Sequence, residues 1–383
     1  MARVLGGADY EIHPRAGRSE TGAQDDRGAA QVKGTSGAES PARWGIGARS
    51  GRKQLWFAAA ASAVFLYLAF ADSSLSGIVG SLASARPIPI AFAVILVLLT
   101  SLLRGWRWQT LLSPIARTSF WLPHDICAIG FLANNVLPAR AGEVVRAGLM
   151  GRMAGISRSQ VFATVLLERL CDLVGLILML AIVPWLAPQA LGGLTRWNAA
   201  LLSVATVVLL AGGLGLTHRL LASDAVRRRV VRMGGVVGHI TQGLIDGFRV
   251  GASPMIVSVA VAQTIGVWFL VGLTFHAIAI AYDLPLDGPA RGLPSALALS
   301  AITGAGSLIP SLPGQIGTFH FFAKQGLELV STNGRALDPI LADTYAVASH
   351  GLQYLTVNIV GVAALLHRGL RIGRPSEWLR IER

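Results

Sequence analysis

The stretch GFLANNVLPARAGEVVRAGLMGR, Gly130 to Arg152, begins like an apolar membrane segment and ends as a charged one. Two asparagines and then Pro138 interrupt its apolar start, and proline breaks a helix because it lacks a backbone donor. Arg140, Glu143 and Arg146 follow within seven residues. We interpret this pattern as a membrane element that is broken rather than continuous.

The composition of the whole chain is that of a membrane protein. Of its 383 residues, 53% are hydrophobic and 14% are charged, and the mean hydropathy is +0.57. Soluble domains carry about 25% charged residues. We therefore predict an all-α, polytopic transmembrane helical bundle. The formal net charge of +13 would also fit nucleic acid. The basic residues stand between apolar runs, however, so we expect no nucleic-acid partner.

Three regions are expected along the chain. Residues 1–53 are rich in small and charged residues and lack apolar periodicity, so we predict a disordered cytosolic tail. Residues 54–367 form the transmembrane domain. Residues 368–383 are predicted to be a basic cytosolic tail, and the chain is expected to carry no soluble transferase domain after it.

About eight membrane helices are expected, since roughly 20 apolar residues cross a bilayer. Two apolar regions are irregular: 125–137 is short and ends at Pro138, and 293–331 is split by SLIPSLPGQIG. We expect re-entrant or broken segments near 125–146 and 305–320. The clear runs lie at 54–71, 88–103, 161–186, 199–217, 254–282 and 340–366.

Loop charge gives the predicted topology, because Lys and Arg stay on the cytosolic side. Arginine-rich and arginine-poor loops alternate only if 125–137 enters the membrane and returns. Region 293–331 fits either as two crossings or as a re-entrant hairpin. Both options leave the N- and C-termini cytoplasmic, in a cell (inner) membrane. The loop arginines counted after the second span and after 125–137 are Arg104, Arg107, Arg117, Arg140, Arg146, Arg152 and Arg158.

Charged residues inside an apolar run are costly and often functional. Glu168 and Asp172 share one helix face, and two carboxylates on one face need a cation. Arg140, Arg146 or Arg169 could supply it. A purely structural ion network and a solvated loop stay open as alternatives. The candidate headgroup or cavity residues are Asn134, Asn135, Arg140, Glu143, Arg146, Glu168, Arg169 and Asp172.

Helix breakers recur in two places at matching spacing. Residues 138–144 (PARAGEV) can be laid on 310–316 (PSLPGQI), with proline, glycine, Glu/Gln and Val/Ile in register. Broken membrane helices at matching places in two halves indicate an internal, inverted repeat. A simple kink or tight turn is the alternative. The candidate hinge residues are Pro138, Gly142, Pro310, Pro313, Gly314 and Gly317.

No cofactor or metal is expected. Cys127 and Cys171 lie in apolar segments without a CxxC motif, and the histidines show no metal-ligand spacing. The phosphate-binding motif GxxxxGK[ST] is absent from the sequence.

At this point the motifs resemble a known family. RGWRWQTLL, N-x-LP-x-R-x-GE-x-x-R, an intramembrane ER-x-x-D and SLIPSLPGQIGTFHFF are similar to the flippase-like membrane family of UPF0104 type, related to the N-terminal transmembrane half of lysylphosphatidylglycerol synthases. The resemblance covers about 54–367 and implies a membrane protein that moves or handles a lipid. One departure is that Gln315 and His320 replace a glycine and an acid of the family pattern, which would favour a different lipid.

Three functional classes remain open. The first is a protein that binds and translocates a polar lipid (a phospholipid, or an aminoacylated or glycosylated lipid), with no catalytic residue. The second is an accessory or scaffold protein for envelope biosynthesis enzymes. The third is an intramembrane glycosyl- or acyltransferase, with Glu143 at the membrane boundary. Membrane lipids are the expected partners, and the oligomeric state is left open.

Overall fold

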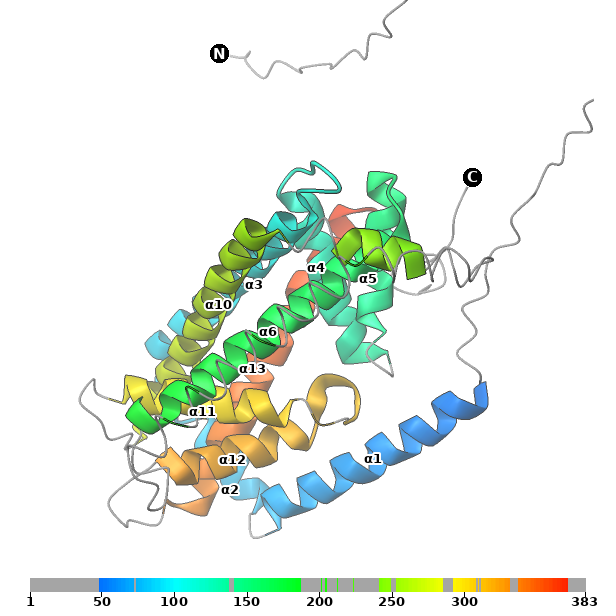
Figure 1. Ribbon diagram of the computed structural model, residues 1–383. Helices are drawn as coiled ribbons and strands as arrows, with labels where there is room; N and C mark the ends of the chain where they lie inside the picture. Colours follow the sequence, from blue (N-terminus) through cyan, green and yellow to red (C-terminus); the bar gives the residue numbers. More distant parts are fainter. Residues whose placement is uncertain are drawn as a thin grey trace, which may run out of the picture. The chain divides into compact units, whose positions relative to one another are not determined.

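The computed structural model (Figure 1) describes residues 48–71, 74–137, 141–186, 241–248, 253–284, 292–307, 309, 311–330 and 337–370, and four single positions between 201 and 223. Within these ranges every regular element is a helix, which confirms the predicted all-α class. The predicted span at 199–217 and residues 1–47 and 371–383 of the two tails lie outside the described residues, except for the single positions just mentioned. So do Pro138, Arg140 and Pro310.

Five described helices coincide with predicted apolar runs. In the described ranges, α3, α10 and α13 are long and apolar enough to cross a membrane. The first helix begins at Ala48, ahead of the tail boundary expected at residue 53, and α6 has 29 residues but carries charges in its middle. The five helices are α1 (Ala48–Phe70), α3 (Pro87–Leu112), α6 (Arg158–Leu186), α10 (Pro254–Ala281) and α13 (Pro339–His367).

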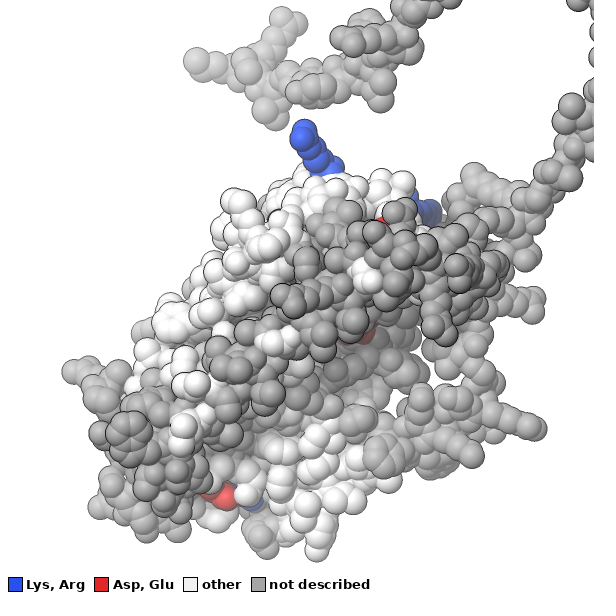
Figure 2. Space-filling view, viewed as in Figure 1, with Lys and Arg blue, Asp and Glu red and all other residues white. Residues whose placement is uncertain are grey.

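The outward faces of these helices are apolar. Ile88 and Phe92 of α3 and Met255 and Phe269 of α10 are large, exposed hydrophobic side chains. Figure 2 shows a face on which the described side chains are almost all uncharged. Soluble monomers rarely expose apolar surface of this extent. We infer that these faces contact lipid.

One sequence-based boundary was wrong. The second apolar run was expected to end at residue 103, with Arg104 and Arg107 in a cytosolic loop, but α3 continues to Leu112. The reason is that a buried stripe of Arg107, Trp108 and Leu111 extends the helical periodicity. Arg146 was also counted as a loop charge and is buried in a helix. Arg104, Arg107 and Arg146 lie inside helices and not in loops, so they cannot be counted as loop charges that indicate the topology.

Both predicted breaker regions form helix–break–helix hairpins. In the first, α4 (Trp121–Val136) packs against α5 (Gly142–Ala154). In the second, α11 (Leu293–Gly306) packs against α12 (Thr318–Val330), with the short helix η3 (Pro313–Gln315) between them. Their depth in the membrane stays a prediction. A short helix, α2 (Leu75–Leu82), lies between α1 and α3 in the sequence.

The order of helices repeats in two halves, α3–α6 and α10–α13. The paired helices have similar lengths, 26 and 28, 16 and 14, 13 and 13, and 29 and 29 residues. Helices α3 and α10 pack together and run in opposite directions. The backbone N–H of Arg86, at the start of α3, donates to the carbonyl of Ala281 at the end of α10, and Gln263 near the start of α10 donates to Thr110 near the end of α3. The repeat is therefore inverted.

Individual residues of α3 and α10 also correspond. When both helices are aligned on their first residues, an exposed proline pair and three pairs of buried positions of the same character coincide. A Cβ on Gly105 would strike His124 of α4, and a Cβ on the matching Gly272 would strike Leu297 of α11. The matched pairs are Pro87 with Pro254, Ala93 with Ala260, Gly105 with Gly272, and Trp108 with Phe275.

The second break depends on glycine conformation and on α1. Gly314 and Gly317 have φ of 75° and 93°, the region that favours glycine, and a Cβ on Gly317 would strike the carbonyl oxygen of Ser62. The Ser62 hydroxyl accepts a hydrogen bond of 2.8 Å from the backbone N–H of Leu312. Gln315, at φ 60°, takes the same region without being glycine. Helix α1 therefore holds the break in place.

The two histidines beside this break lie against one another. The rings of His320 and His350 are 4.7 Å apart between centroids, and His350 Nε2 is 2.7 Å from the carbonyl oxygen of Gly314. The N–H of Gly317 donates to His320 Nδ1 at 3.4 Å. His320 thus helps fix the break.

We predict that Gly317→Ala lowers the free energy of unfolding by about 2 kcal/mol or more, because alanine is strained at this φ and clashes with Ser62. The matched control is Gly351→Ala in α13, where a Cβ meets nothing within 4 Å. That change should be neutral or stabilise by about 0.5–1 kcal/mol. Thermal unfolding in detergent, followed by tryptophan fluorescence, checks both. Equal melting temperatures for the two variants would contradict the prediction.

Candidate functional site

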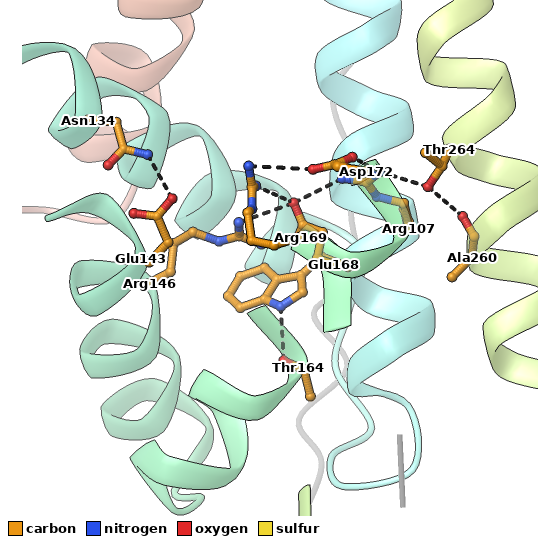
Figure 3. Close-up of polar contacts among 11 residues, drawn as sticks. Arg107, Asn134, Glu143, Arg146, Thr164, Glu168, Arg169, Asp172, Ala260 and Thr264 are labelled. Atoms are coloured by element: carbon orange, nitrogen blue, oxygen red, sulfur yellow. Dashed lines mark hydrogen bonds and ion pairs between the residues drawn. The ribbon is translucent and has the colours of Figure 1, made fainter. Parts of the chain in front are cut away.

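Glu168, in the middle of α6, accepts hydrogen bonds from three arginines (Figure 3). Arg146 of α5 contacts both of its carboxylate oxygens, with one bond of 3.2 Å. Arg107 of α3 donates to Oε1 at 3.0 Å, and Arg169 donates to the same atom at 2.9 Å. The carboxylate is fully buried. It therefore joins α3, α5 and α6 through a single acceptor group.

Asp172, one turn further along α6, closes the network. It pairs with Arg107 and also with Arg169, at 3.4 Å between Oδ2 and Nη1. The second contact of Arg107 Nη1 is the hydroxyl of Thr264 on α10, at 2.8 Å. The network thus reaches from the first half of the repeat into the second. We call Arg107, Arg146, Glu168, Arg169 and Asp172 the ion network.

The ion network carries more positive than negative charge. Its three guanidinium groups face two carboxylates, and the Nε atoms of all three arginines are buried without a hydrogen-bond partner among the described residues. An isolated buried charge is expensive, and even a well-paired one offers little stability over an apolar replacement. Stability alone is therefore a weak reason for this arrangement.

Packing around Arg146 explains the glycines of the opening stretch. The guanidinium carbon lies 4.1 Å from the centre of the Trp108 ring, and Trp108 donates to the hydroxyl of Thr164 at 3.1 Å. A Cβ on Gly130 would strike the stem of Arg146, and one on Gly142 would strike the carbonyl of Gly130. Only glycine allows α4 and α5 to approach this closely.

The two asparagines sit at the break itself. Asn134 accepts a 2.8 Å hydrogen bond from the first N–H of α5, at Gly142, and donates to Glu143 at 3.3 Å. It therefore caps α5 from across the hairpin. Asn135 donates to Asn358 of α13 at 3.0 Å, which connects the break to the second half of the repeat.

The structure brings most of the predicted site together. Arg146, Glu168, Arg169 and Asp172 are in direct contact, and Asn134 with Glu143 lies beside them at the start of α5. Of the hinge residues, Gly142 lies at the first break, and Pro313, Gly314 and Gly317 lie at the second. Arg140, Pro138 and Pro310 are outside the described residues.

Sequence reasoning missed Arg107, which is 1% exposed and pairs with both carboxylates. The signal was available. No proline or glycine cluster follows Leu103, and Arg107, Trp108 and Leu111 continue the helical stripe to Pro114. A charge next to apolar residues of the same stripe indicates a buried ion pair rather than a loop.

The second half of the repeat replaces the ions with neutral groups. Aligning the first residues of α6 and α13 places Ser349 at the position of Glu168 and Gln353 at that of Asp172. The alignment of α3 with α10 places Thr274 at the position of Arg107. Among the described residues, no group of three or more His, Cys, Asp or Glu could hold a metal ion, and Cys127 and Cys171 are free and buried.

Comparison with known proteins identifies the family. Residues 55–361 match the model of the family described as the lysylphosphatidylglycerol synthase TM region. A UPF0104 membrane protein of Methanocaldococcus jannaschii is 24% identical over 193 residues, which are 49% of this chain and 75% of that relative. The chain therefore belongs to the lysylphosphatidylglycerol synthase TM region family, and it is a multi-pass membrane protein.

We predict that Glu168→Gln lowers the free energy of unfolding by about 3 kcal/mol or more, because it removes the shared negative charge of three buried guanidinium groups and replaces one accepting oxygen with a donating NH2 group. Chemical or thermal unfolding of the purified protein in detergent provides the measurement. The matched control is Asp283→Asn, which breaks the exposed ion pair between Arg86 and Asp283. An exposed pair contributes about 0–1 kcal/mol. If both variants lost the same stability, the network would not be the central ionic contact of the fold.

Proposed function

We propose that this member of the lysylphosphatidylglycerol synthase TM region family binds a polar lipid and moves its headgroup between the two leaflets. The physical problem is to carry a charged group across hydrocarbon, where an unpaired charge costs several kcal/mol. A protein solves it with buried polar groups and irregular backbone that together line a path.

The ion network is the observation that carries the proposal. Charged groups at the centre of a bundle with apolar outer faces are rare and usually serve a substrate or ion path. Arg107, Arg146 and Glu168 are almost completely buried and come from three different helices. Their positive surplus favours an anionic group such as a phosphate, which guanidinium binds through two parallel hydrogen bonds.

The inverted repeat and its two broken hairpins support the same function. Membrane transporters are frequently built from inverted repeats that place the substrate near the middle of the bilayer, between discontinuous helices. Asn135 of the first break contacts Asn358 in the other half, so movement of one hairpin would be felt by the other half. Coupling to an ion gradient through the carboxylates is part of the proposal.

The proposal also covers the location of the protein and its chemistry. The protein would act in the cell membrane with both termini cytosolic, and without covalent chemistry on the lipid. A scaffold for envelope biosynthesis enzymes is the alternative outcome of the tests. His320 and Gln315, which depart from the family pattern at the second break, would set a different choice of lipid.

The test is reconstitution of the full chain in liposomes that contain a fluorescent phosphatidylglycerol. Dithionite added outside quenches only the outer leaflet, so translocation raises the fraction that is quenched. Wild-type protein should move the lipid clearly faster than protein-free liposomes do. Glu168→Gln should slow this rate by about tenfold or more, because the path loses a buried charge that the headgroup passes.

The control is Arg86→Gln, which removes an exposed arginine at the N-cap of α3, outside the ion network, and should keep the wild-type rate. Gel filtration and thermal unfolding identify any variant that has failed to fold. A wild-type rate equal to that of empty liposomes would contradict the proposal. A scaffold would give that result and co-purify with a specific enzyme, whereas a transferase would convert its lipid in detergent without a sealed bilayer.

A further inference from the structure

Arg104 differs from the arginines of the ion network, because it has no ion pair or hydrogen bond among the described residues. It lies on α3, one turn before Arg107, and is partly exposed. The neighbouring carboxylate of Asp172 is already engaged by Arg107 and Arg169. An arginine left unpaired inside a membrane bundle needs either water or a ligand.

Arg104 lines a pocket between the two halves of the repeat. The cavity has a volume of about 30 Å³, and its walls come from α3, α4, α10 and α13. Beside the guanidinium stand the hydroxyls of Thr100, Ser101 and Thr274 and the amide of Gln353, with no carboxylate in the lining. The other lining residues are Val97, Ala128, Phe131, Val271 and Val357.

The guanidinium is held in a position that leaves its hydrogen-bonding edge available. Its carbon lies 4.9 Å from the centre of the Phe131 ring on α4. Stacking on an aromatic face engages the plane of the group, and its N–H groups stay free to form a two-pronged contact with an anion. Thr100 and Thr274 donate their hydroxyl protons to the carbonyls of Leu96 and Leu270, and Gln353 donates to Ser349. The guanidinium is therefore the main donor of a lining that lacks a carboxylate, which is an arrangement suited to a phosphoryl group.

A comparison of the two halves of the repeat shows that this space is open, whereas the related space in the other half is filled. The alignment of α3 with α10 places Trp268 at the position of Ser101 and Val271 at that of Arg104. The indole of Trp268 packs where a Cβ on Gly304 or Gly175 would strike it, so it fills the space between α10, α11 and α6. Trp268 thus fills one of two related spaces, and the other stays open beside Arg104, which has no ion pair within the described part of the chain.

We propose that the pocket formed by Arg104, Ser101, Thr274 and Gln353 is a binding site for a phosphoryl anion. The phosphoryl group could belong to a lipid headgroup, as the proposed function would require, or to free phosphate. The walls formed by Val97, Val271 and Val357 are apolar, which suits the start of the acyl chains of a lipid. Only the lipid source rests on the proposed function, since phosphate binding would stand without it.

The experiment measures binding to the purified full chain in detergent, by the shift in thermal unfolding on titration with three probes. These are inorganic phosphate, phosphatidylglycerol, and diacylglycerol with the same acyl chains. We expect phosphatidylglycerol to bind at least tenfold more tightly than diacylglycerol, and Arg104→Gln to weaken it by about tenfold to a hundredfold. Arg86→Gln, at the N-cap of the same helix, is the matched control and should bind like the wild type.

A second variant tests the pocket without removing the charge. Ser101→Trp copies the residue that fills the related space and should abolish binding while Arg104 remains, provided that its melting temperature shows a folded protein. If inorganic phosphate binds by itself and also competes with the lipid, the site takes the phosphoryl group from either source. If only the lipid binds, the site is a headgroup site.

The proposal is overturned if folded Arg104→Gln binds phosphatidylglycerol as tightly as the wild type does, or if diacylglycerol binds equally well. These outcomes differ from failure of the proposed function. Retained binding without any translocation in liposomes would remove the transport function and leave the phosphoryl site standing.

Discussion

Glu168 is the acceptor on which three helices of this bundle depend. A carboxylate and three guanidinium groups in an apolar interior are tolerable only when each finds a partner, and one acidic side chain serves Arg107, Arg146 and Arg169 together. This constraint explains the glycines of the opening stretch. Gly130 and Gly142 let α5 come close enough to α4 for Arg146 to reach the carboxylate.

The same constraint separates the two halves of the inverted repeat. Their helices have the same order and similar lengths, yet the ionic positions of the first half are held by Ser349, Gln353 and Thr274 in the second. A repeat with charges in both halves would bury twice the charge at the same interface. Here one half carries the charges and the other offers neutral polar groups, and Arg104 stands at the boundary between them without an ion pair to any residue that the structure describes. An asymmetric interface of this kind gives a polar ligand one preferred place.

Much of this architecture could be predicted from the sequence, because apolar runs and helix breakers are local signals. Five apolar runs became helices, and the breaks at Gly142 and Gly314 lie where the repeated Pro-Gly pattern placed them. The pairing of Glu168 with Arg146 was also accessible, since buried opposite charges must meet. The roles of Arg104 and Arg107 were not found. Their position after an apolar run looks like a loop, although the continued stripe of Arg107, Trp108 and Leu111 indicates a helix. The partners of Arg107 and the pocket beside Arg104 become visible only once α10 and α6 pack against α3.

The most direct measurement is an experimental structure of the full chain in lipid nanodiscs that contain phosphatidylglycerol. Our account predicts a lipid whose phosphoryl group lies within hydrogen-bond distance of Arg104, between α3, α4, α10 and α13. It also predicts that Glu168 stays bound to Arg107 and Arg146 beside it. A pocket closed by side chains, with Arg104 paired to a carboxylate of the protein and no lipid between the two halves, would contradict the account.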